Sequence, residues 1–488
     1  MEGRKADNGV TTLSSNSGNK GQKIRRSLPV SGEVKPPAAR EAPAPGTAPD
    51  GQSSRADRLM EEIVSEENIK KAVKTVIRNR GAPGIDGMTV DALMEYMRTH
   101  WQTIGRQLTE GTYKPFPVRR VEIPKPSGGI RELGIPTAID RTIQQAMLLV
   151  LTPIFEPLFS DSSYGFRPGR NAWQAVQKAK EYIEQGYEWV VDMDISKFFD
   201  RVNHDMLMAR VARHVKDKRV LKLIRLYLQS GVMVNGVVQA TDKGTPQGGP
   251  LSPLLANILL DDLDKELERR GHKFVRYADD ENIYVKSRRA GERVLSGIRT
   301  FIEKKLKLKL NEDKTAVDRP QKRKFLGFSF HRQNGQWKVK LSPKTVERFR
   351  ERMRSLTDRN RSQSMQQRIA HINEYQRGWM AYYQIIETPS VLGTLDGWVR
   401  RRLRACVWKQ WKNVRTRIRK LRALNLPEQH VFEIANTRKG PWRISRMLNA
   451  VMDNAYWVSN GLQSLTSIRE HLLQDRPTAV HRTVHTVV

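Results

Sequence analysis

The sequence predicts an α+β fold in which an antiparallel β-sheet is followed by a helical C-terminal region. Residues Lys273 to Val285, KFVRYADDENIYV, place β-favouring runs on both sides of a short acidic turn, which is typical of a β-hairpin. Residues Tyr187 to Asn203 place a buried apolar strand before an acidic end and a helix start. Residues 338 to 422 carry apolar positions at helical spacing among many basic residues.

The composition indicates a polyanionic partner. Lysine and arginine total 86 against 52 acidic residues, which gives a formal net charge of +34. Nucleic acid fits this charge best, and an anionic membrane is the competing partner. No apolar run approaches the roughly eighteen residues of a membrane span, and no signal peptide is visible, so we expect a soluble cytoplasmic protein without a membrane partner. A single cysteine, Cys406, excludes an internal disulfide and a CxxC zinc site.

The acidic turn is a candidate metal site. Asp279 and Asp280 are adjacent like charges, which persist either in water or beside a cation, and Mg²⁺ prefers carboxylate oxygens. An isolated pair of this kind is more often a solvated turn, so a third carboxylate is required. Asp192 and Asp194 at the end of the upstream strand can supply it. Strand alternation places both on one face and leaves the choice between them open.

The N-terminal third begins with a segment that we expect to be disordered. Residues 1 to 54 contain six prolines and no aromatic residue, so they cannot bury enough apolar surface to fold. Two short helices follow from Arg55, with Ser65 as the N-cap of the second. Residues 118 to 136 alternate apolar and polar side chains around PKPSGG, which predicts a second β-hairpin.

Basic residues near this hairpin and after the next helix are candidate ligand contacts. Lys125 and Arg131 lie at or beside the turn, where the residues alone favour a solvated hairpin tip. The segment SSYGFRPGRNAWQAV combines Arg167 and Arg170 with aromatic rings, a mixture that can hold a nucleic-acid backbone and stack on bases. Its aromatic residues, Tyr164 and Phe166, are equally consistent with packing. A helix is expected to start at Asn171.

The second half alternates loops and helices. Residues 241 to 260 place a Gly/Pro-rich loop containing Gln247 before an apolar helix that starts at Ser252 and Pro253, and we expect Asn257 on the surface of that helix. A further helix is expected from about Ala290 to Leu308. The segment KFLGFSF then predicts a tight hairpin, in which Gly327 suits a close backbone approach.

The helical C-terminal region is strongly basic. Residues 338 to 422 hold 22 basic and 6 acidic residues. A helix capped by Ser342 carries one apolar stripe, and the block RRRLRACVWKQWKNVRTRIRKLR interleaves tryptophans with cations. This mixture is expected for phosphate contact combined with stacking. The candidate nucleic-acid contacts in it are Arg400, Arg401, Arg402, Trp408, Lys409, Trp411 and Lys412.

Ordered motifs across residues 55 to 465 resemble group II intron-encoded reverse transcriptases. DMDISKFFD, GTPQGGPLSPLLANILL, RYADD, NEDKT and FLGFSF are similar to the palm motifs of a reverse transcriptase. RGAPGIDGMT, VRRVEIPKPSGGIRELGIPTAIDR and SSYGFRPGRNAWQAV resemble the fingers of the group II intron proteins, and the region after 338 resembles their thumb and maturase domain. The resemblance implies a right-hand polymerase fold that copies RNA into DNA and assists intron splicing.

The resemblance also assigns roles to residues. It implies that Asp194, Asp279 and Asp280 are catalytic and hold two Mg²⁺ ions, with the carbonyl of Ile195 as a further ligand. It places Phe199, five residues after Asp194, under the sugar of the incoming nucleotide. The residues that it assigns to the dNTP are Lys125, Arg131, Gln247 and Lys314, the last beside the departing pyrophosphate. Glu281 departs from the expected pattern, and it either faces solvent or alters metal affinity.

The domains expected from these comparisons of motifs are 1–54, a disordered extension; 55–110, an N-terminal extension and fingers loop; 111–335, fingers and palm; 338–470, thumb and maturase with a DNA-binding region; and 471–488, a tail. The missing cysteines argue against the C-terminal endonuclease that many group II intron proteins carry. The implied partners are intron RNA, an RNA template with a DNA primer, dNTPs and target DNA, bound by a monomer or dimer in a ribonucleoprotein. The alternatives are a splicing-only RNA-binding maturase and a reverse transcriptase of another bacterial lineage.

Overall fold

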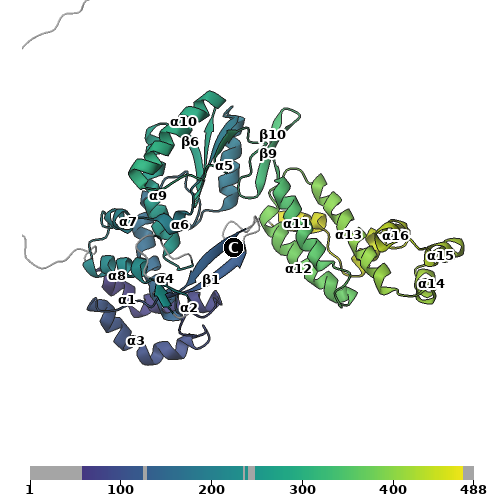
Figure 1. Ribbon diagram of the computed structural model, residues 1–488, viewed down its shortest axis with the longest axis horizontal. Coiled ribbons are helices and arrows are strands. Elements are labelled where there is room, and N and C mark those ends of the chain that lie inside the picture. Colours follow the sequence, from purple (N-terminus) through teal and green to yellow (C-terminus); the bar gives the residue numbers. More distant parts are fainter. Residues whose placement is uncertain (1–57, 125–128, 235–236, 240–243, 245–247, 476–488) are drawn as a thin grey trace, which may run out of the picture. The chain divides into compact units, whose positions relative to one another are not determined.

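The computed structural model describes residues 58–124, 129–234, 237–239, 244 and 248–475. The predicted disordered extension and Gln247 therefore lie outside the described residues, as does Lys125. Helices and strands are both abundant, so the predicted mixed content is confirmed (Figure 1).

The first part of the fold is a group of helices around a small sheet. Its helices are α1 (Leu59–Val64), α2 (Glu66–Arg78), α3 (Leu93–Thr109) and α4 (Ala138–Phe155). Its sheet has the order β2-β1-β4-β5, from strands β1 (Val118–Pro124), β2 (Ile130–Ile135), β4 (Val232–Val234) and β5 (Val237–Gln239). The antiparallel pairing of β1 with β2 confirms the predicted hairpin.

A second sheet, entirely antiparallel, forms the centre of the fold. Its order is β6-β7-β3-β8, from strands β6 (Lys273–Tyr277), β7 (Asp280–Val285), β3 (Trp189–Asp194) and β8 (Ala316–Asp318). The predicted hairpin at Lys273 to Val285 is confirmed, because β6 and β7 pair directly. The two strands that end in acidic residues, β3 and β7, are neighbours.

Helices cover both faces of this sheet because its strands alternate apolar side chains to each side (Figure 1). Val191, Ile283 and Phe274 share the core that contains α9 (Ser252–Arg269) and α10 (Arg288–Phe301). Val190 and Tyr284 belong to the other core, with α5 (Ala172–Glu184). The helices between β3 and β4 in the chain are α6 (Phe198–Arg201), α7 (His204–Val211) and α8 (Lys218–Gln229).

The helix starts were predicted more accurately than the ends. Asn171 caps α5 in a capping box, and Ser252 with Pro253 starts α9, as expected. Ser65 lies at the N-cap of α2 but donates its hydroxyl to the Glu62 carbonyl at 2.8 Å instead of capping. The helix expected to end at Leu308 leaves α-helical geometry at Phe301 and continues as a π-helical turn.

The C-terminal region begins with a two-stranded sheet of β9 (Phe328–Gln333) and β10 (Gln336–Leu341). A Cβ at Gly327, just before β9, would lie 2.6 Å from the Tyr383 hydroxyl, so the predicted close approach of backbone is confirmed. Ser342 caps α11 as predicted. The helices are α11 (Pro343–Leu356), α12 (Met365–Tyr383), α13 (Ser390–Gln410), α14 (Val414–Arg422), α15 (Glu428–Ala435), α16 (Pro441–Met447), α17 (Asn454–Ser459) and α18 (Leu465–Gln474).

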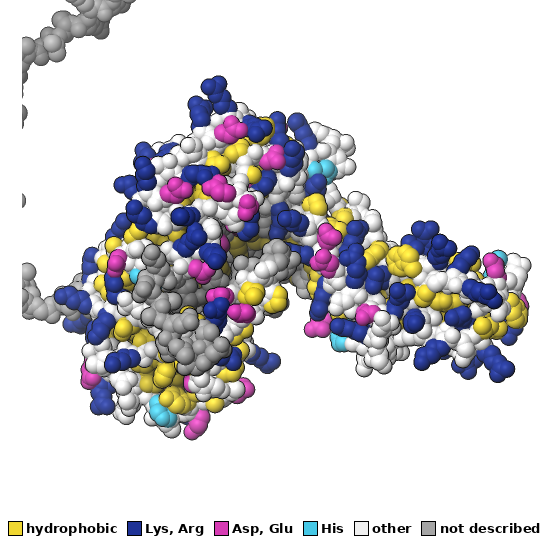
Figure 2. Space-filling view, viewed as in Figure 1, with side chains coloured by type: hydrophobic (Ala, Val, Ile, Leu, Met, Phe, Trp, Pro, Cys, Tyr) yellow, Lys and Arg dark blue, Asp and Glu magenta, His cyan; other side chains and the backbone are white. Residues whose placement is uncertain are grey.

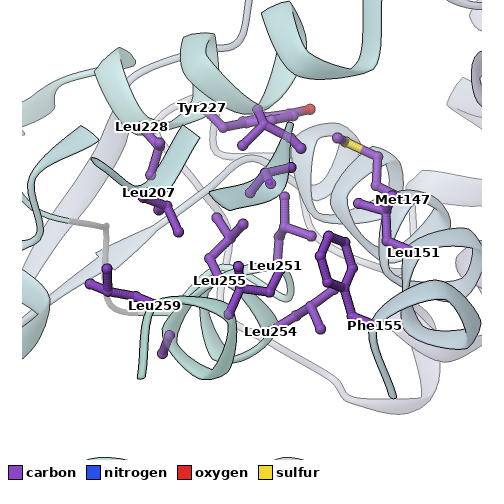
Figure 3. Close-up of a cluster of buried hydrophobic side chains, with 14 of the residues drawn as sticks. Met147, Leu151, Phe155, Leu207, Tyr227, Leu228, Leu251, Leu254, Leu255 and Leu259 are labelled. Carbon is purple, nitrogen blue, oxygen red and sulfur yellow. The ribbon is translucent and has the colours of Figure 1, made fainter. Parts of the chain in front are cut away.

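Leucine-rich packing joins the helices of the first part. Figure 3 shows side chains from α4, α7, α8 and α9 converging, with Leu151 and Phe155 of α4 close to Leu254 and Leu255. This packing fixes α9, which lies directly before the acidic hairpin in the chain. In the described ranges, none of the helices combines the length and apolar character that crossing a membrane requires.

We expect Leu151→Ala to lower the free energy of unfolding by about 2–5 kcal/mol, because the lost side chain leaves a cavity in this core. Leu151 is 0% exposed, whereas Leu149 on the same helix is 37% exposed. Leu149→Ala is therefore the matched control and should change stability by about 0.5 kcal/mol or less. Urea unfolding followed by circular dichroism compares the two variants. Equal losses would contradict the assignment of Leu151 to the core.

Candidate active site

The candidate site is built by the register of three neighbouring strands. Asp194, the last residue of β3, is the direct partner of Asp280, the first residue of β7. Tyr277 at the end of β6 pairs with Asp280, so Ala278 and Asp279 form the two-residue turn between them. Ala278 has a φ of +58°, the left-handed region that a residue with a Cβ adopts only where its surroundings hold it. Acidic side chains from two distant segments therefore meet at one end of the sheet.

A lysine from a third segment holds Asp194. The Lys314 ammonium lies 3.1 Å from each carboxylate oxygen of Asp194, although it is largely exposed. The backbone N–H of Asn311 donates to the carbonyl of Asp194 at 2.8 Å, and the N–H of Asp194 donates to the Thr315 hydroxyl at 3.3 Å. Ile195 continues the strand as a single antiparallel bridge to Leu310. The segment that carries Lys314 is thus fastened to the end of β3.

The other strand carboxylate, Asp192, already has a partner. Arg323 donates two hydrogen bonds to one oxygen of Asp192, at 2.6 and 2.9 Å. Burial raises the pKa of Asp192, and the Arg323 charge opposes that effect. Asp192 shares the face of Asp194, as alternation predicted, but its ion pair distinguishes it from the residue at the strand end.

The carboxyl group of Asp280 has a strongly raised pKa. The surrounding protein desolvates its carboxylate, and the negative charges of Asp279, Asp192 and Asp194 add to the effect, so the pKa of Asp280 rises to about 7. Its side chain nevertheless keeps an exposed surface. A carboxylate in this position gains stability from any cation that approaches from solvent.

The donor chemistry suits a hard divalent cation, because Asp194, Asp279 and Asp280 offer only carboxylate oxygens. Within the described ranges, no group of three or more His, Cys, Asp or Glu side chains is gathered closely enough to hold a metal ion. Lys314 instead supplies the positive charge beside Asp194. The residues therefore fit a divalent ion by type and by location at one sheet end, in an arrangement where a lysine is the present counter-ion.

A buried ion pair between Arg276 and Asp264 holds the acidic turn on its core side. The Arg276 guanidinium binds Asp264 of α9 through two hydrogen bonds of 2.5 and 2.7 Å, and both side chains are buried. The same guanidinium donates to the Ala278 carbonyl at 3.0 Å and to the Asn257 side-chain oxygen at 2.9 Å. Because bidentate arginine–carboxylate pairs have fixed geometry, this network ties the acidic turn to the core helix. The expectation that Asn257 lies on the helix surface is wrong.

The loop at Gly165 is packed against the turn without spare space. Asn257 donates its amide to the Gly165 carbonyl at 2.9 Å. A Cβ at Gly165 would lie 2.3 Å from the Ala278 nitrogen and 2.9 Å from the Tyr277 carbonyl carbon. Only glycine fits at this position without a shift of the turn backbone.

Glu281 points away from solvent and from the acidic cluster. Its side chain is 1% exposed, and its nearest cation, the Arg276 Nε, is 4.0 Å away, too far for a hydrogen bond. Burial, reinforced by the negative charge of Asp264, raises the pKa of Glu281 well above its usual range. The alternative in which Glu281 faces solvent is therefore wrong.

The residues assigned to the nucleotide are only partly described. Arg131 lies on β2 opposite Ile123. Phe199 is half-buried, with its ring 5.1 Å from that of Phe198 in an edge-on contact, and Phe198 faces the core. These placements leave the proposed contacts with a nucleotide as predictions.

Several expected nucleic-acid contacts are corrected by burial. Arg167 is buried and binds Glu156 at 2.8 Å together with the carbonyls of Ser160 and Ser163, so it braces its own loop. Trp408 and Trp411 belong to the C-terminal core and cannot stack on bases.

Other basic candidates keep solvent access. Lys409 and Lys412 are exposed, and Arg400, Arg401 and Arg402 are half-buried. Arg170 binds Asp161 at 2.6 Å and lies over the Tyr164 ring.

The sequence interpretation missed the supporting residues Arg276, Asp264 and Arg323. A usable signal was present for Arg276, which interrupts a β-favouring run, whereas Asp264 lies among other charged residues of its helix. A charge inside an apolar element is expensive unless it is paired, so Arg276 alone predicts a buried acidic partner without identifying it. Arg323 gave no comparable signal, since it lies in a polar loop 131 residues from its partner.

Comparisons with known proteins identify families that match two regions of the chain. Residues 123–330 match the family described as "Reverse transcriptase (RNA-dependent DNA polymerase)", and residues 346–424 match "Group II intron, maturase-specific domain". Protein YkfC of Escherichia coli is 34% identical over 305 residues, which cover 54% of this chain and 80% of that protein.

Two further similarities are less complete. The group II intron-encoded protein LtrA of Lactococcus lactis is 32% identical over 323 residues, covering 53% of this chain and 54% of LtrA, so the match spans about half of that protein. Among solved structures, the partial Cas6-RT-Cas1–Cas2 complex covers 53% of this chain and 46% of its own, at 25% identity and a TM-score of 0.33, too low to support an argument about the fold.

We expect Gly165→Ala to displace the 277–280 turn, because the added methyl group overlaps its backbone. Overpacking of this kind lowers the free energy of unfolding by about 1–3 kcal/mol. Mn²⁺ binding, measured by electron paramagnetic resonance, should weaken in the same variant. Gly393→Ala is the control, since a Cβ there meets nothing within 4 Å. Unchanged Mn²⁺ binding in Gly165→Ala would contradict the proposed link between the loop and the turn.

We expect Asp280→Asn to stabilise the metal-free protein at pH 8. The pKa of Asp280 in the folded protein, about 7, exceeds the value of about 3.9 for an unfolded chain. The contribution of Asp280 to the free energy of unfolding is therefore fully present below about pH 4 and is lost as the pH rises through about 7. The difference in melting temperature between variant and wild type should grow from pH 4 to pH 8. Added MgCl₂ should reverse it, and a pH-independent difference would contradict the raised pKa.

Proposed function

The chain belongs to the group II intron-encoded reverse transcriptases, and from this membership we propose that it copies intron RNA into DNA during retrohoming and assists splicing of that intron as a maturase. The observation that carries the polymerase part is the register of β3 and β7, which sets Asp194 opposite Asp280 beside the Asp279 turn. RNA binding alone does not require clustered carboxylates, whose burial and mutual repulsion raise the pKa of Asp280.

Two Mg²⁺ ions are the proposed cofactors, held by Asp194, Asp279, Asp280 and the Ile195 carbonyl. When bound, such ions stabilise both the attacking and the leaving oxygen of an in-line phosphoryl transfer. The chain's own contribution is to fix the carboxylates. Arg276 holds the turn through the Ala278 carbonyl, and the pairing of β3 with β7 holds Asp194. The site is thereby oriented before substrate arrives.

Lys314 has two roles in this proposal. In the structure it neutralises Asp194, and its side chain is 63% exposed, so it can leave when a divalent ion takes its place. It then lies beside the acidic cluster, where an ammonium group can hold or protonate the departing pyrophosphate. Lys314 thus changes partner between the resting and the loaded site.

The remaining nucleotide contacts follow the family assignment. Lys125 and Arg131 would bind the triphosphate, and Gln247 would contact the nascent base pair. Phe199 would lie under the sugar, where its ring excludes a 2′-hydroxyl by overlap. The proposed selectivity for dNTPs over ribonucleotides rests on that ring.

The proposed domains are fingers and palm over residues 111–335 and a thumb with maturase domain over residues 338–470. The second region carries a surplus of cations, and Figure 2 shows lysine and arginine side chains over much of its visible face. Intron RNA, the template–primer duplex and target DNA are the proposed ligands of this surface. The proposed working form is a monomer or dimer in a ribonucleoprotein with intron RNA.

We expect Asp279→Asn to abolish extension of a DNA primer on an RNA template while RNA affinity changes less than about twofold, because only one charge of many is removed and it is not a cation. Primer extension with Mg²⁺ and dNTPs, combined with filter binding, measures both properties. Asp205→Asn, at an exposed residue that pairs with Arg225, is the control and should extend normally. Undiminished synthesis by Asp279→Asn would contradict the metal assignment.

A further inference from the structure

A cavity of about 310 Å³ lies among α11, α13 and α16. It is distant in sequence from the acidic site, and its walls are basic and aromatic. Three arginines and two tryptophans line it, and no carboxylate is among its described lining residues. They are Arg354, Arg359, Trp398, Arg402 and Trp442, with Thr357 and Ala405 completing the wall.

The walls are held in place by hydrogen bonds between the three helices. Arg402 of α13 donates to the Thr357 hydroxyl at 2.5 Å, which fastens the end of α11. Arg404 is buried and donates to the carbonyls of Ser445 and Met452, at 2.7 and 3.0 Å. This second set fastens α13 to α16. The cavity is therefore formed in the ligand-free protein, and little ordering is needed to fill it.

Both tryptophans are already positioned as stacking surfaces. The Arg401 guanidinium lies 3.9 Å from the centre of the Trp442 ring, yet 39% of Trp442 remains exposed. Arg402 and Arg354 lie 5.3 and 6.0 Å from the centre of the Trp398 ring. Planar rings interleaved with guanidinium groups are the surface on which unstacked bases bind.

The cations of the cavity lack an internal counter-ion. Among the described residues, no carboxylate is within ion-pair distance of Arg354, Arg359 or Arg402. Asp358, which lies between two lining positions, accepts the backbone N–H of Asn360 at 3.1 Å. Burial lowers the pKa of Arg402, a sign that its charge has lost part of its water. A phosphate entering the cavity would meet one half-buried guanidinium, that of Arg402, and two exposed ones, those of Arg354 and Arg359.

We propose that this cavity receives one unpaired nucleotide of an RNA, with its base against Trp442 and Trp398 and its phosphate beside the arginines. The volume is near the lower end, about 300 Å³, of pockets that enclose small ligands. A base within a duplex has both faces covered by its neighbours, so only an extruded or single-stranded nucleotide can enter. This inference rests on the proposed RNA-binding function and gives it a specific contact.

The test compares two RNA hairpins that differ by a single bulged nucleotide, bound by the full chain. The wild type should bind the bulged hairpin more tightly than the fully paired one. Trp442→Ala should reduce affinity for the bulged hairpin roughly tenfold and leave the paired hairpin unchanged. Trp442→Phe should restore most of the loss. Arg359→Gln should weaken the bulged complex and reduce the slope of log affinity against log salt by about 1.

Two matched controls separate the cavity from general charge and stacking. Phe432 is 47% exposed beside Arg422, so Phe432→Ala removes an arginine–aromatic pair that lines no part of the cavity. Arg443→Gln removes an exposed charge next to Trp442. Both variants should keep the preference for the bulge. Equal losses in the controls and the cavity variants, or no loss in Trp442→Ala, would overturn the proposal.

The same assays distinguish this inference from the proposed function. If the wild type extends a primer but binds the two hairpins equally, only the cavity proposal fails. If it prefers the bulged hairpin but synthesises no DNA, only the polymerase proposal fails. Circular dichroism of each variant excludes loss of affinity through unfolding.

Discussion

Repulsion between carboxylates is the constraint on which this structure depends. Asp194, Asp279 and Asp280 converge at one end of a sheet, and burial together with the repulsion of the neighbouring carboxylates raises the pKa of Asp280. The fold opposes this repulsion through the covalent chain, through strand pairing and through nearby cations, and the charge of Lys324 lowers the pKa of Asp280. Arg276 acts from within the core, where Asp264 satisfies its charge, and Lys314 acts from the solvent side. The acidic turn is stable because its backbone is held independently of its side chains.

The buried Arg276–Asp264 pair illustrates why such a site needs a large surrounding core. Desolvating two charges is costly, and an ion pair repays that cost only with good geometry and full hydrogen bonding. Here α9 supplies both Asp264 and Asn257, and leucines of the same helix pack against α4 in the first core. Apolar packing thus positions α9, and the polar residues of α9 hold the acidic turn through Arg276. Glu281 adds a buried carboxyl that has a raised pKa and no hydrogen-bond partner among the described residues.

Local patterns predicted much of the fold and the location of the site. The hairpins predicted at residues 118–136 and 273–285 and the caps at Asn171 and Ser342 were correct, because each depends on residues close together in the chain. The predictions that failed concern side chains whose burial depends on the three-dimensional fold. Strand alternation placed Asp192 beside Asp194, but only the fold brings Arg323 to one of them. Composition likewise could not tell that Trp408 and Trp411 face the core while Trp442, in a less conspicuous segment, reaches solvent. Arginine has a similar ambiguity, since Arg167 and Arg404 bind backbone carbonyls inside the protein.

The tight contact at Gly165 has a mechanical consequence. Phe166, the next residue, has a φ of +59° and a largely exposed ring, so it lies at the surface while its neighbour touches the acidic turn. The N–H of Tyr164 donates to the Arg276 carbonyl at 2.9 Å, which couples the same loop to strand β6. A displacement of the backbone at Phe166 would therefore reach the acidic turn through direct contact between backbone atoms, with no side chain between them.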